Sequence, residues 1–268
     1  LPNVILPNAL MTEYALVSFL QSKHLQNNGD IHPLEQPMGF KYNTLGAFLY
    51  NEELGVFVQH DGFMEKELIP VKDLEPSQRP INQKWSWDRI LRSVYIKQAD
   101  VLQGLYFFED DFDADTHVRN FKFYEQFTVH ESSLSPCVHS ILAAKIGDTH
   151  KAYEMYLRTA RLDLDNYNND TEDGLHITSM AGSYLSIVQG FGGLRIKNQC
   201  LYLNPHCPSQ WNGYGFQILL NNQPVKIDVT QSGYRIKNLG TQEISIHVGP
   251  QDSMQIIPLG AGAEHSSN

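Results

Sequence analysis

The sequence predicts an α+β chain in which a helical part, residues 1–193, is followed by a small antiparallel β-sandwich, residues 194–268. Before Gly193, apolar residues recur at the three- and four-residue spacing of helices. After Gly193, short runs alternate between apolar and polar residues and are separated by turn residues. With 268 residues, 41% of them hydrophobic, the chain can bury the core of one large domain or of two smaller ones.

Five segments of the helical part are predicted helices because their apolar residues fall on one face. They lie at about 9–22, 92–108, 135–146, 149–162 and 179–193. Ser135 stands before Pro136, and a hydroxyl at the cap with proline in the first turn favours a helix start. Asp148 is placed to cap the following helix, and the glycines at 192–193 end the last one. Such helices, alternating with polar loops, favour a helical array or a helix-lined barrel.

Six runs in the second part are predicted strands. They lie at 194–203, 215–220, 224–231, 234–239, 243–248 and 254–258. Alternation is clearest from Glu243 to Val248, where every second residue is apolar. Short strands divided by turns are typical of two packed antiparallel sheets. The last segment, residues 261–268, is predicted to be a frayed end.

Charge and cysteine content exclude several classes of protein. A formal net charge of −10 argues against a nucleic-acid partner. No stretch approaches the roughly 20 apolar residues that span a membrane, and the first ten residues lack the basic region of a signal peptide. Cys200 and Cys207 are too far apart for a usual zinc knuckle. The acidic run 161–174 lacks the glycine at loop position 6 and the glutamate at position 12 of a calcium-binding EF-hand. We therefore expect no metal or cofactor, and reduced thiols in a cytoplasmic protein.

Two predicted helix starts each carry hydroxyl groups and an imidazole. His130, Ser132 and Ser133 precede one helix, and His176, Thr178 and Ser179 precede another. A helix start presents unpaired N–H groups and the positive end of the helix dipole, so each segment is a candidate anion site. The alternative is that the hydroxyls are ordinary helix caps and the histidines ordinary loop residues. If the two starts converge, their donors can hold a phosphate without a large basic patch.

A separate group of residues has the character of a sugar site. Trp85 and Trp87 offer apolar stacking surfaces, and Lys97 and Gln98 offer directed hydrogen bonds. Aromatic residues at helical spacing are also common in protein cores. A lysine on an otherwise apolar predicted helix is harder to place there, because a buried ammonium requires a partner.

Three long runs closely resemble the family 65 glycoside hydrolases: KQADVLQGLYFF at 97–108, FYEQFTVHESSLSPCVHSILAAKIGD at 123–148, and the run from Tyr153 to Ile196 that contains DGLHITSMAGS. The resemblance is strong over residues 50–200 and looser in the β part. The runs QRPINQKWSWDRILRS and LDLDNYNNDTEDGLHITSM are most similar to the family members that act on maltose.

The resemblance implies a fold and a set of site residues. The family has a large N-terminal β-sandwich, a helical linker, an (α/α)6 barrel and a small C-terminal β domain, of which residues 1–193 match the later barrel helices and residues 194–268 the β domain. Lys97 and Gln98 would hold the glucosyl unit. The residues implied at the phosphate site are Ser132, Ser133, His176, Thr178 and Ser179.

The implied reaction is the inverting phosphorolysis of maltose by inorganic phosphate, giving β-glucose 1-phosphate and glucose. Bound phosphate is already an ionised nucleophile, so one general acid suffices. No residue matches the family's general-acid motif, and this glutamate is expected before Leu1. The resemblance also implies a homodimer. The chain by itself is therefore expected to be inactive.

Two other functions remain open from the sequence. One is a phosphorylase or an inverting hydrolase of another α-glucobiose, such as trehalose, kojibiose or nigerose. A hydrolase needs a base carboxylate where the hydroxyl-rich helix starts lie, and this argues against it. The other is a non-catalytic carbohydrate-binding fragment.

Overall fold

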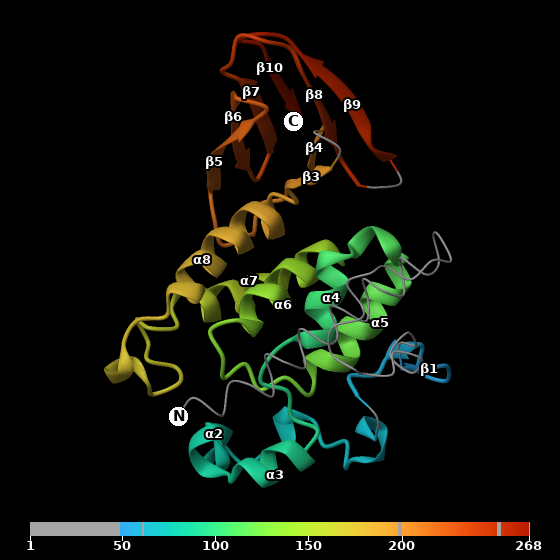
Figure 1. The fold of residues 1–268 in the computed structure, drawn as a ribbon. Coiled ribbons are helices and arrows are strands. Elements are labelled where there is room, and N and C mark those ends of the chain that lie inside the picture. Colours follow the sequence, from blue (N-terminus) through green and yellow to red (C-terminus); the bar gives the residue numbers. More distant parts are fainter. Residues whose placement is uncertain (1–48, 61, 198–199, 251–252, 268) are drawn as a thin grey trace, which may run out of the picture. The chain divides into compact units, whose positions relative to one another are not determined.

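The computed structural model describes residues 49–60, 62–197, 200–250 and 253–267 (Figure 1). The chain divides into two compact units, residues 1–131 and residues 132–268. The helix predicted at about 9–22 lies outside the described residues. Within the described ranges, no helix has both the length and the apolar character needed to cross a membrane.

The described part of the first unit is a short antiparallel hairpin, several single turns of 3-10 helix and four α-helices. The hairpin pairs β1 (Tyr50–Asn51) with β2 (Val56–Phe57). The helices are α2 (Ile81–Lys84), α3 (Trp87–Arg92), α4 (Asp100–Phe107) and α5 (Ala114–Glu125). Buried aromatic and aliphatic side chains from several of these elements form its interior, among them Phe63, Ile81, Leu102, Phe121 and Tyr124.

The helix predicted at 92–108 is interrupted in the structure. α3 ends at Arg92, α4 begins at Asp100, and an extended segment lies between them. There Ile96 forms a parallel bridge with Thr128, through bonds from the Ile96 N–H to the Phe127 carbonyl (2.9 Å) and from the Val129 N–H to the Ile96 carbonyl (3.0 Å). These backbone bonds favour the extended form, and the alternating burial of residues 94–97 fits it.

Side chains of α5 hold the hairpin. Asn120 is fully buried and its Oδ1 accepts the N–H of Phe57 at 2.9 Å, while the Tyr124 hydroxyl donates to the Phe57 carbonyl at 2.6 Å. Burial raises the pKa of Tyr124 well above its ordinary range, so the phenol remains a donor at every physiological pH.

Glu131 bonds to the segment of the first unit that leads into α2. Its side chain is buried and accepts the guanidinium Nε–H of Arg79 at 2.8 Å and the backbone N–H of Ile81 at 2.7 Å. Both carboxylate oxygens are therefore bonded inside the protein. This explains why a glutamate can be buried within the His-Glu-Ser-Ser motif.

The second unit begins with three α-helices, and each was predicted. They are α6 (Ser135–Lys145), α7 (Thr149–Ala160) and α8 (Ile177–Leu185), the last continued by a π-helical turn, η8 (Ser186–Phe191). Asp148 caps α7 as expected, its side chain accepting the N–H of Lys151 at 3.0 Å. The cap predicted for α6 was wrong: the cap position is Leu134, and Ser135 is a fully buried residue of the first turn.

Gly182 allows α8 to pack closely against its neighbours. A Cβ atom at this position would lie 2.8 Å from Cys137 Cβ in α6 and 3.1 Å from Thr159 Cγ2 in α7. Contacts this short with atoms near the backbone are not tolerated in packed interiors, so a larger residue would force the helices apart.

Two four-stranded sheets form the rest of the second unit. One has the order β10-β7-β6-β5 and the other the order β3-β4-β8-β9. The strands are β3 (Arg195–Lys197), β4 (Cys200–Leu203), β5 (Gly213–Leu220), β6 (Gln223–Thr230), β7 (Gly233–Asn238), β8 (Ile244–Val248), β9 (Gln255–Leu259) and β10 (Glu264–Ser267).

The sheets differ from the predicted ones in three respects. The run predicted as one strand at 194–203 forms two strands, β3 and β4, which pair antiparallel. β4 and β8 pair in parallel, although all other pairs are antiparallel, because alternation of apolar residues does not reveal strand direction. The tail predicted to be frayed forms β10, which pairs with β7 in the register Glu264 to Lys237.

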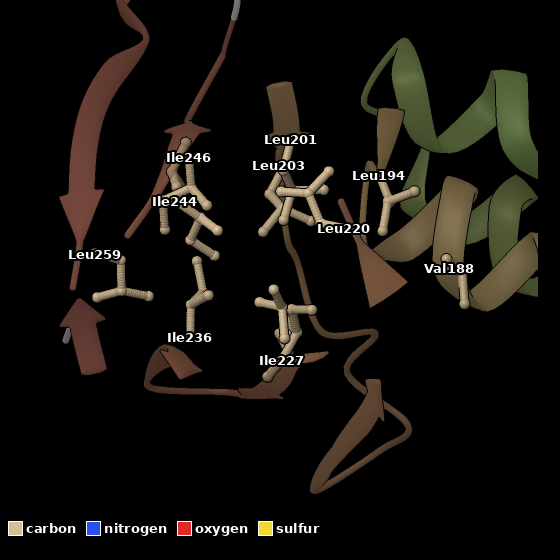
Figure 2. Packing of buried hydrophobic residues seen from close by; sticks show 13 residues of the cluster. Val188, Leu194, Leu201, Leu203, Leu220, Ile227, Ile236, Ile244, Ile246 and Leu259 are labelled. Carbon is tan, nitrogen blue, oxygen red and sulfur yellow. The ribbon is translucent and has the colours of Figure 1, made fainter. Parts of the chain in front are cut away.

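Apolar side chains from both sheets fill the space between them (Figure 2). β6 shows the pattern most clearly, since Val225, Ile227 and Val229 are buried and the residues between them are not. Val188 of η8 and Leu194 belong to the same cluster, so the end of the last helix is part of the sandwich core.

Asn238 connects the two sheets. The residue is completely buried at the end of β7, and its Nδ2 group donates to the carbonyls of Gln242, Leu259 and Gly260 at 2.7, 3.0 and 3.1 Å. Its Oδ1 accepts the N–H of Gly240 at 2.9 Å. An amide fits this position, because its NH2 group donates two protons to carbonyls while its oxygen accepts an N–H.

Replacement of this amide by a carboxylate tests its role. In Asn238→Asp, a carboxylate would face three carbonyl oxygens, and we expect a loss of more than about 3 kcal/mol in the free energy of unfolding, as for other unpaired buried charges. Urea denaturation of the full-length protein, followed by a probe in the β-sandwich, would measure this. Asn212→Asp on the exposed surface is the matched control, with a change within about 0.5 kcal/mol. Equal midpoints for the two variants would contradict the assignment.

Two glycine-to-alanine variants test the packing of α8. Gly104 lies in α4 with no described atom within 4 Å of an added Cβ, so Gly104→Ala should stabilise by up to about 1 kcal/mol through helix propensity. Gly182→Ala gains the same propensity but overpacks the contact with Cys137, at a cost of about 1–3 kcal/mol. The expected result in calorimetry is a higher melting temperature for the first variant than for the second. The opposite order would show that α8 has room to move.

Candidate functional site

The first element of the candidate site is the segment that enters α6. Ser132 is buried and its Oγ accepts the N–H of Leu134 at 3.2 Å, whereas Ser133 is partly exposed. A hydroxyl that accepts a bond retains its own proton for donation. Ser132 can therefore stabilise the turn and still donate to a ligand.

The second element is the start of α8. His176 occupies the cap position, and its carbonyl accepts the N–H groups of Ser179 and Met180 at 3.0 and 3.2 Å. The first residues of the helix, Ile177 and Thr178, have no earlier turn to which their N–H groups could donate. Together with the helix dipole, they form a positive surface of the kind that binds anions.

The structure brings these two helix starts together. The Thr178 hydroxyl donates to Ser133 Oγ over 2.8 Å, so the segments are separated by a single hydrogen bond. Ser133 accepts this bond through its oxygen and keeps its own hydroxyl proton. No described residue accepts that proton. The convergence that the sequence left open is present within the second unit.

His176 is held by carboxylates of the loop that follows α7. Its ring Nδ1 lies 2.6 Å from Asp163 Oδ1, and its backbone N–H donates to Asp163 Oδ2 at 2.8 Å. The ring Nε2 lies 3.6 Å from Asp170 Oδ2. Desolvation acts to raise the pKa of Asp163, but the hydrogen bonds from the His176 ring and backbone outweigh it and lower this pKa.

Ser179 has a different position from the one expected. Its hydroxyl is buried and donates to the Thr159 carbonyl of α7 at 2.8 Å. The hydroxyl proton is thus engaged inside the protein and ties α8 to α7. A contact between Ser179 and an anion stays a prediction, and it would require this bond to break.

Lys97 and Gln98 lie in the first unit, in the loop before α4. They were predicted to lie on a helix, but they belong to the extended segment that precedes Asp100, the first residue of α4. Both side chains are half-buried, and neither forms a hydrogen bond or ion pair with another described residue. Nearby, Gln59 Nε2 donates to Asp100 Oδ2 at 3.1 Å. The role of Lys97 and Gln98 in binding glucose stays a prediction.

Trp85 belongs to a different part of the first unit. The Arg89 guanidinium lies 3.5 Å from the centre of its ring, and its Nε1–H donates to Gln78 Oε1 at 2.9 Å. These residues border an open cavity of about 430 Å³, and neither Lys97 nor Gln98 lines it. The cavity beside Trp85 therefore does not include Lys97 or Gln98, the two polar residues that the predicted sugar site placed with this tryptophan.

Sequence reasoning did not identify Asp163 and Asp170 as site residues. They lie thirteen and six residues before His176, in a run rich in aspartate and asparagine where spacing does not distinguish one carboxylate from another. Left-handed backbone at Asn166 and Asn169 bends this loop, and Asn166 Oδ1 accepts the N–H of Asp170 at 3.1 Å. Asparagine tolerates this conformation well, so the Asn-rich composition was the available signal.

Comparison with known proteins places the chain in a family. Residues 43–185 match the model of the glycosyl hydrolase family 65 central catalytic domain, and residues 194–252 match that of the C-terminal domain of the same family. A maltose phosphorylase of Bacillus subtilis (strain 168) is 57% identical over 182 residues, which is 68% of this chain and 24% of that protein. An α,α-trehalose phosphorylase of Geobacillus stearothermophilus is 38% identical over 197 residues, covering 74% of this chain and 26% of the relative.

A solved structure agrees with these similarities. It is assigned as a kojibiose phosphorylase from the human microbiome, and it matches with 37% identity and a TM-score of 0.75 over 82% of this chain and 30% of its own. The chain spans about a quarter of the length of the curated relatives that it matches. Since the catalytic-domain model matches more than half of its residues, the predicted membership is confirmed, and the chain belongs to glycosyl hydrolase family 65.

Proposed function

We propose that the protein containing this chain carries out the inverting phosphorolysis of maltose. The observation that carries the proposal is the hydrogen bond between Thr178 and Ser133, which unites two donor-rich helix starts in one place. Maltose is the proposed substrate because the maltose phosphorylase of Bacillus subtilis is 57% identical, whereas the trehalose and kojibiose phosphorylases are 38% identical or less.

Phosphate would be held by donors that the protein does not use elsewhere. These are the hydroxyl protons of Ser132 and Ser133 and the first N–H groups of α8, together with His176 Nε2 when the imidazole carries both protons. Charge-assisted hydrogen bonds of this kind are roughly twice as strong as neutral ones. A site built from them binds a small anion although the chain has a net charge of −10.

The reaction follows from this arrangement. A phosphate oxygen attacks the anomeric carbon of the glucosyl unit, the glycosidic bond breaks, and the departing glucose takes a proton from a general acid. The products are β-glucose 1-phosphate and glucose. Lys97 and Gln98 are proposed to hold the glucosyl unit, and alignment of the two substrates supplies much of the rate.

An inverting hydrolase is disfavoured because hydroxyl and N–H donors converge at the site. Such an enzyme needs a base that accepts a proton from water. Of the two carboxylates beside His176, Asp163 has both oxygens bonded to this residue, and Asp170 lies 3.6 Å from Nε2. Phosphorolysis of another α-glucobiose remains the alternative, as the trehalose and kojibiose phosphorylases among the relatives suggest.

The wider setting is also proposed. Residues 194–268 would be the C-terminal β domain of the enzyme, and the helices before them part of an (α/α)6 barrel. The enzyme would be a cytoplasmic homodimer that needs no cofactor. Cys137, Cys200 and Cys207 are free thiols, which supports a reducing compartment.

Release of glucose from maltose tests the reaction. With the full-length enzyme, we expect release to require inorganic phosphate and to yield equal amounts of glucose and glucose 1-phosphate. Trehalose and kojibiose, tested in parallel, should react much more slowly. Glucose release at the same rate without phosphate would contradict the proposal, and faster reaction of another disaccharide would correct the substrate.

Variants of the two proposed subsites should separate phosphate from sugar. We expect Ser133→Ala and His176→Ala to raise the KM for phosphate by about tenfold or more, the effect of losing a hydrogen bond to a charged group, with a change of less than about twofold for maltose. Lys97→Ala should show the reverse pattern. Initial rates over a grid of both substrates would measure this. A larger effect of His176→Ala on maltose than on phosphate would show that the anion site is misplaced.

A further inference from the structure

We propose that Asp163 and Asp170 set the phosphate affinity of the enzyme in opposite directions through His176. Asp163 is a positioning residue that holds the imidazole so that Nε2 faces the anion, and Asp170 competes with phosphate for Nε2. The inference deepens the proposed function and depends on it.

The position of Asp163 leaves one orientation for the ring. One oxygen lies 2.6 Å from Nδ1 and the other accepts the backbone N–H of the same residue at 2.8 Å. Both the side chain and the backbone of His176 are therefore fixed by one carboxylate. A second-sphere carboxylate on one ring nitrogen is a common means of presenting the other nitrogen to a ligand. Nε2 must face the anion whether it donates a proton to phosphate or accepts one from it.

The ionisation of Asp163 supports this role. Its pKa is lowered because the hydrogen bonds from His176 outweigh desolvation. The stabilising pairing is fully present above the ordinary pKa of an aspartate and is lost only as the pH falls through the lowered value. Asp163 is thus negatively charged throughout the range in which phosphorolysis would be assayed.

Asp170 approaches the other ring nitrogen. Its Oδ2 lies 3.6 Å from Nε2, too far for a hydrogen bond but close enough for an ion pair with a protonated ring. Asn166 Oδ1 holds the loop in this place by accepting the N–H groups of Asp170 and Thr171 at 3.1 and 3.2 Å. An anion bound to Nε2 would therefore be repelled by this carboxylate. Phosphate must displace the Asp170 side chain or bind despite the repulsion.

The two aspartates thus differ in what their removal does. In Asp163 the two oxygens accept the ring and the backbone N–H separately, so an asparagine at 163 would place its NH2 group against one of these two N–H groups. An asparagine at 170 removes a negative charge beside the anion and leaves the ring in place. Loss of fold would weaken phosphate binding in both variants. An increase in affinity is explained only by relief of competition.

Three variants of the full-length enzyme test the inference. We expect Asp163→Asn to raise the KM for phosphate by about tenfold or more, as when a charge-assisted hydrogen bond is lost, and Asp170→Asn to lower it by about threefold or more. The KM for maltose should change by less than about twofold in each. Asp165→Asn is the matched control, because this aspartate lies in the same segment but pairs with Arg161, and its KM values should stay near those of the wild type.

A measurement without turnover separates this inference from the proposed function. The rise in melting temperature caused by inorganic phosphate reports binding directly. If the wild-type enzyme shows no such rise and no phosphorolysis, the proposed function is wrong. If it shows both, unchanged phosphate affinity in Asp163→Asn and Asp170→Asn overturns the inference alone. Weaker binding in both variants overturns the competition by Asp170.

Discussion

The close packing of α6, α7 and α8 is the constraint on which the candidate site depends. Gly182 lets α8 approach Cys137, and buried hydroxyls bond across the helices, from Ser140 to the Ala152 carbonyl and from Ser179 to the Thr159 carbonyl. Both of these hydroxyls donate to a carbonyl of the neighbouring helix. The helix starts are therefore positioned by the helices themselves and not by flexible loops, which is the condition for a site held ready for its ligand.

An acidic chain can bind an anion because the donors are local. Backbone N–H groups, serine hydroxyls and one imidazole act within a few ångströms, whereas the net charge of −10 is spread over the whole surface and screened by salt. The same distinction between local groups and net charge applies to the two carboxylates next to His176. Asp163 has both oxygens engaged by hydrogen bonds to the histidine, and Asp170 is a local negative charge that an arriving anion meets.

The sandwich is attached to the helices of the second unit by aromatic and aliphatic packing. Trp211 contacts Tyr156 of α7 and Phe191 of η8, with ring centres 5.1 and 5.2 Å apart, and Val188 enters the sandwich core. The π-helical turn that carries Val188 ends at Phe191, and Gly193, two residues further on, has a φ of 58° that suits glycine. The helices that bear the candidate site are thus supported from their far ends by the β part.

The sequence by itself determined the change from helices to strands near residue 193, the three helices of the second unit, the family, and the two helix starts that are candidates for binding an anion. These depend on local periodicity, capping and long motifs, which are written in neighbouring residues. Tertiary structure decided the rest. Backbone pairing of Ile96 with Thr128 ended a predicted helix, and pairing with β7 ordered the tail. Spatial proximity, which spacing along the chain does not encode, brought Thr178 to Ser133, turned the Ser179 hydroxyl inward, and selected Asp163 and Asp170 from many acidic residues as the partners of His176.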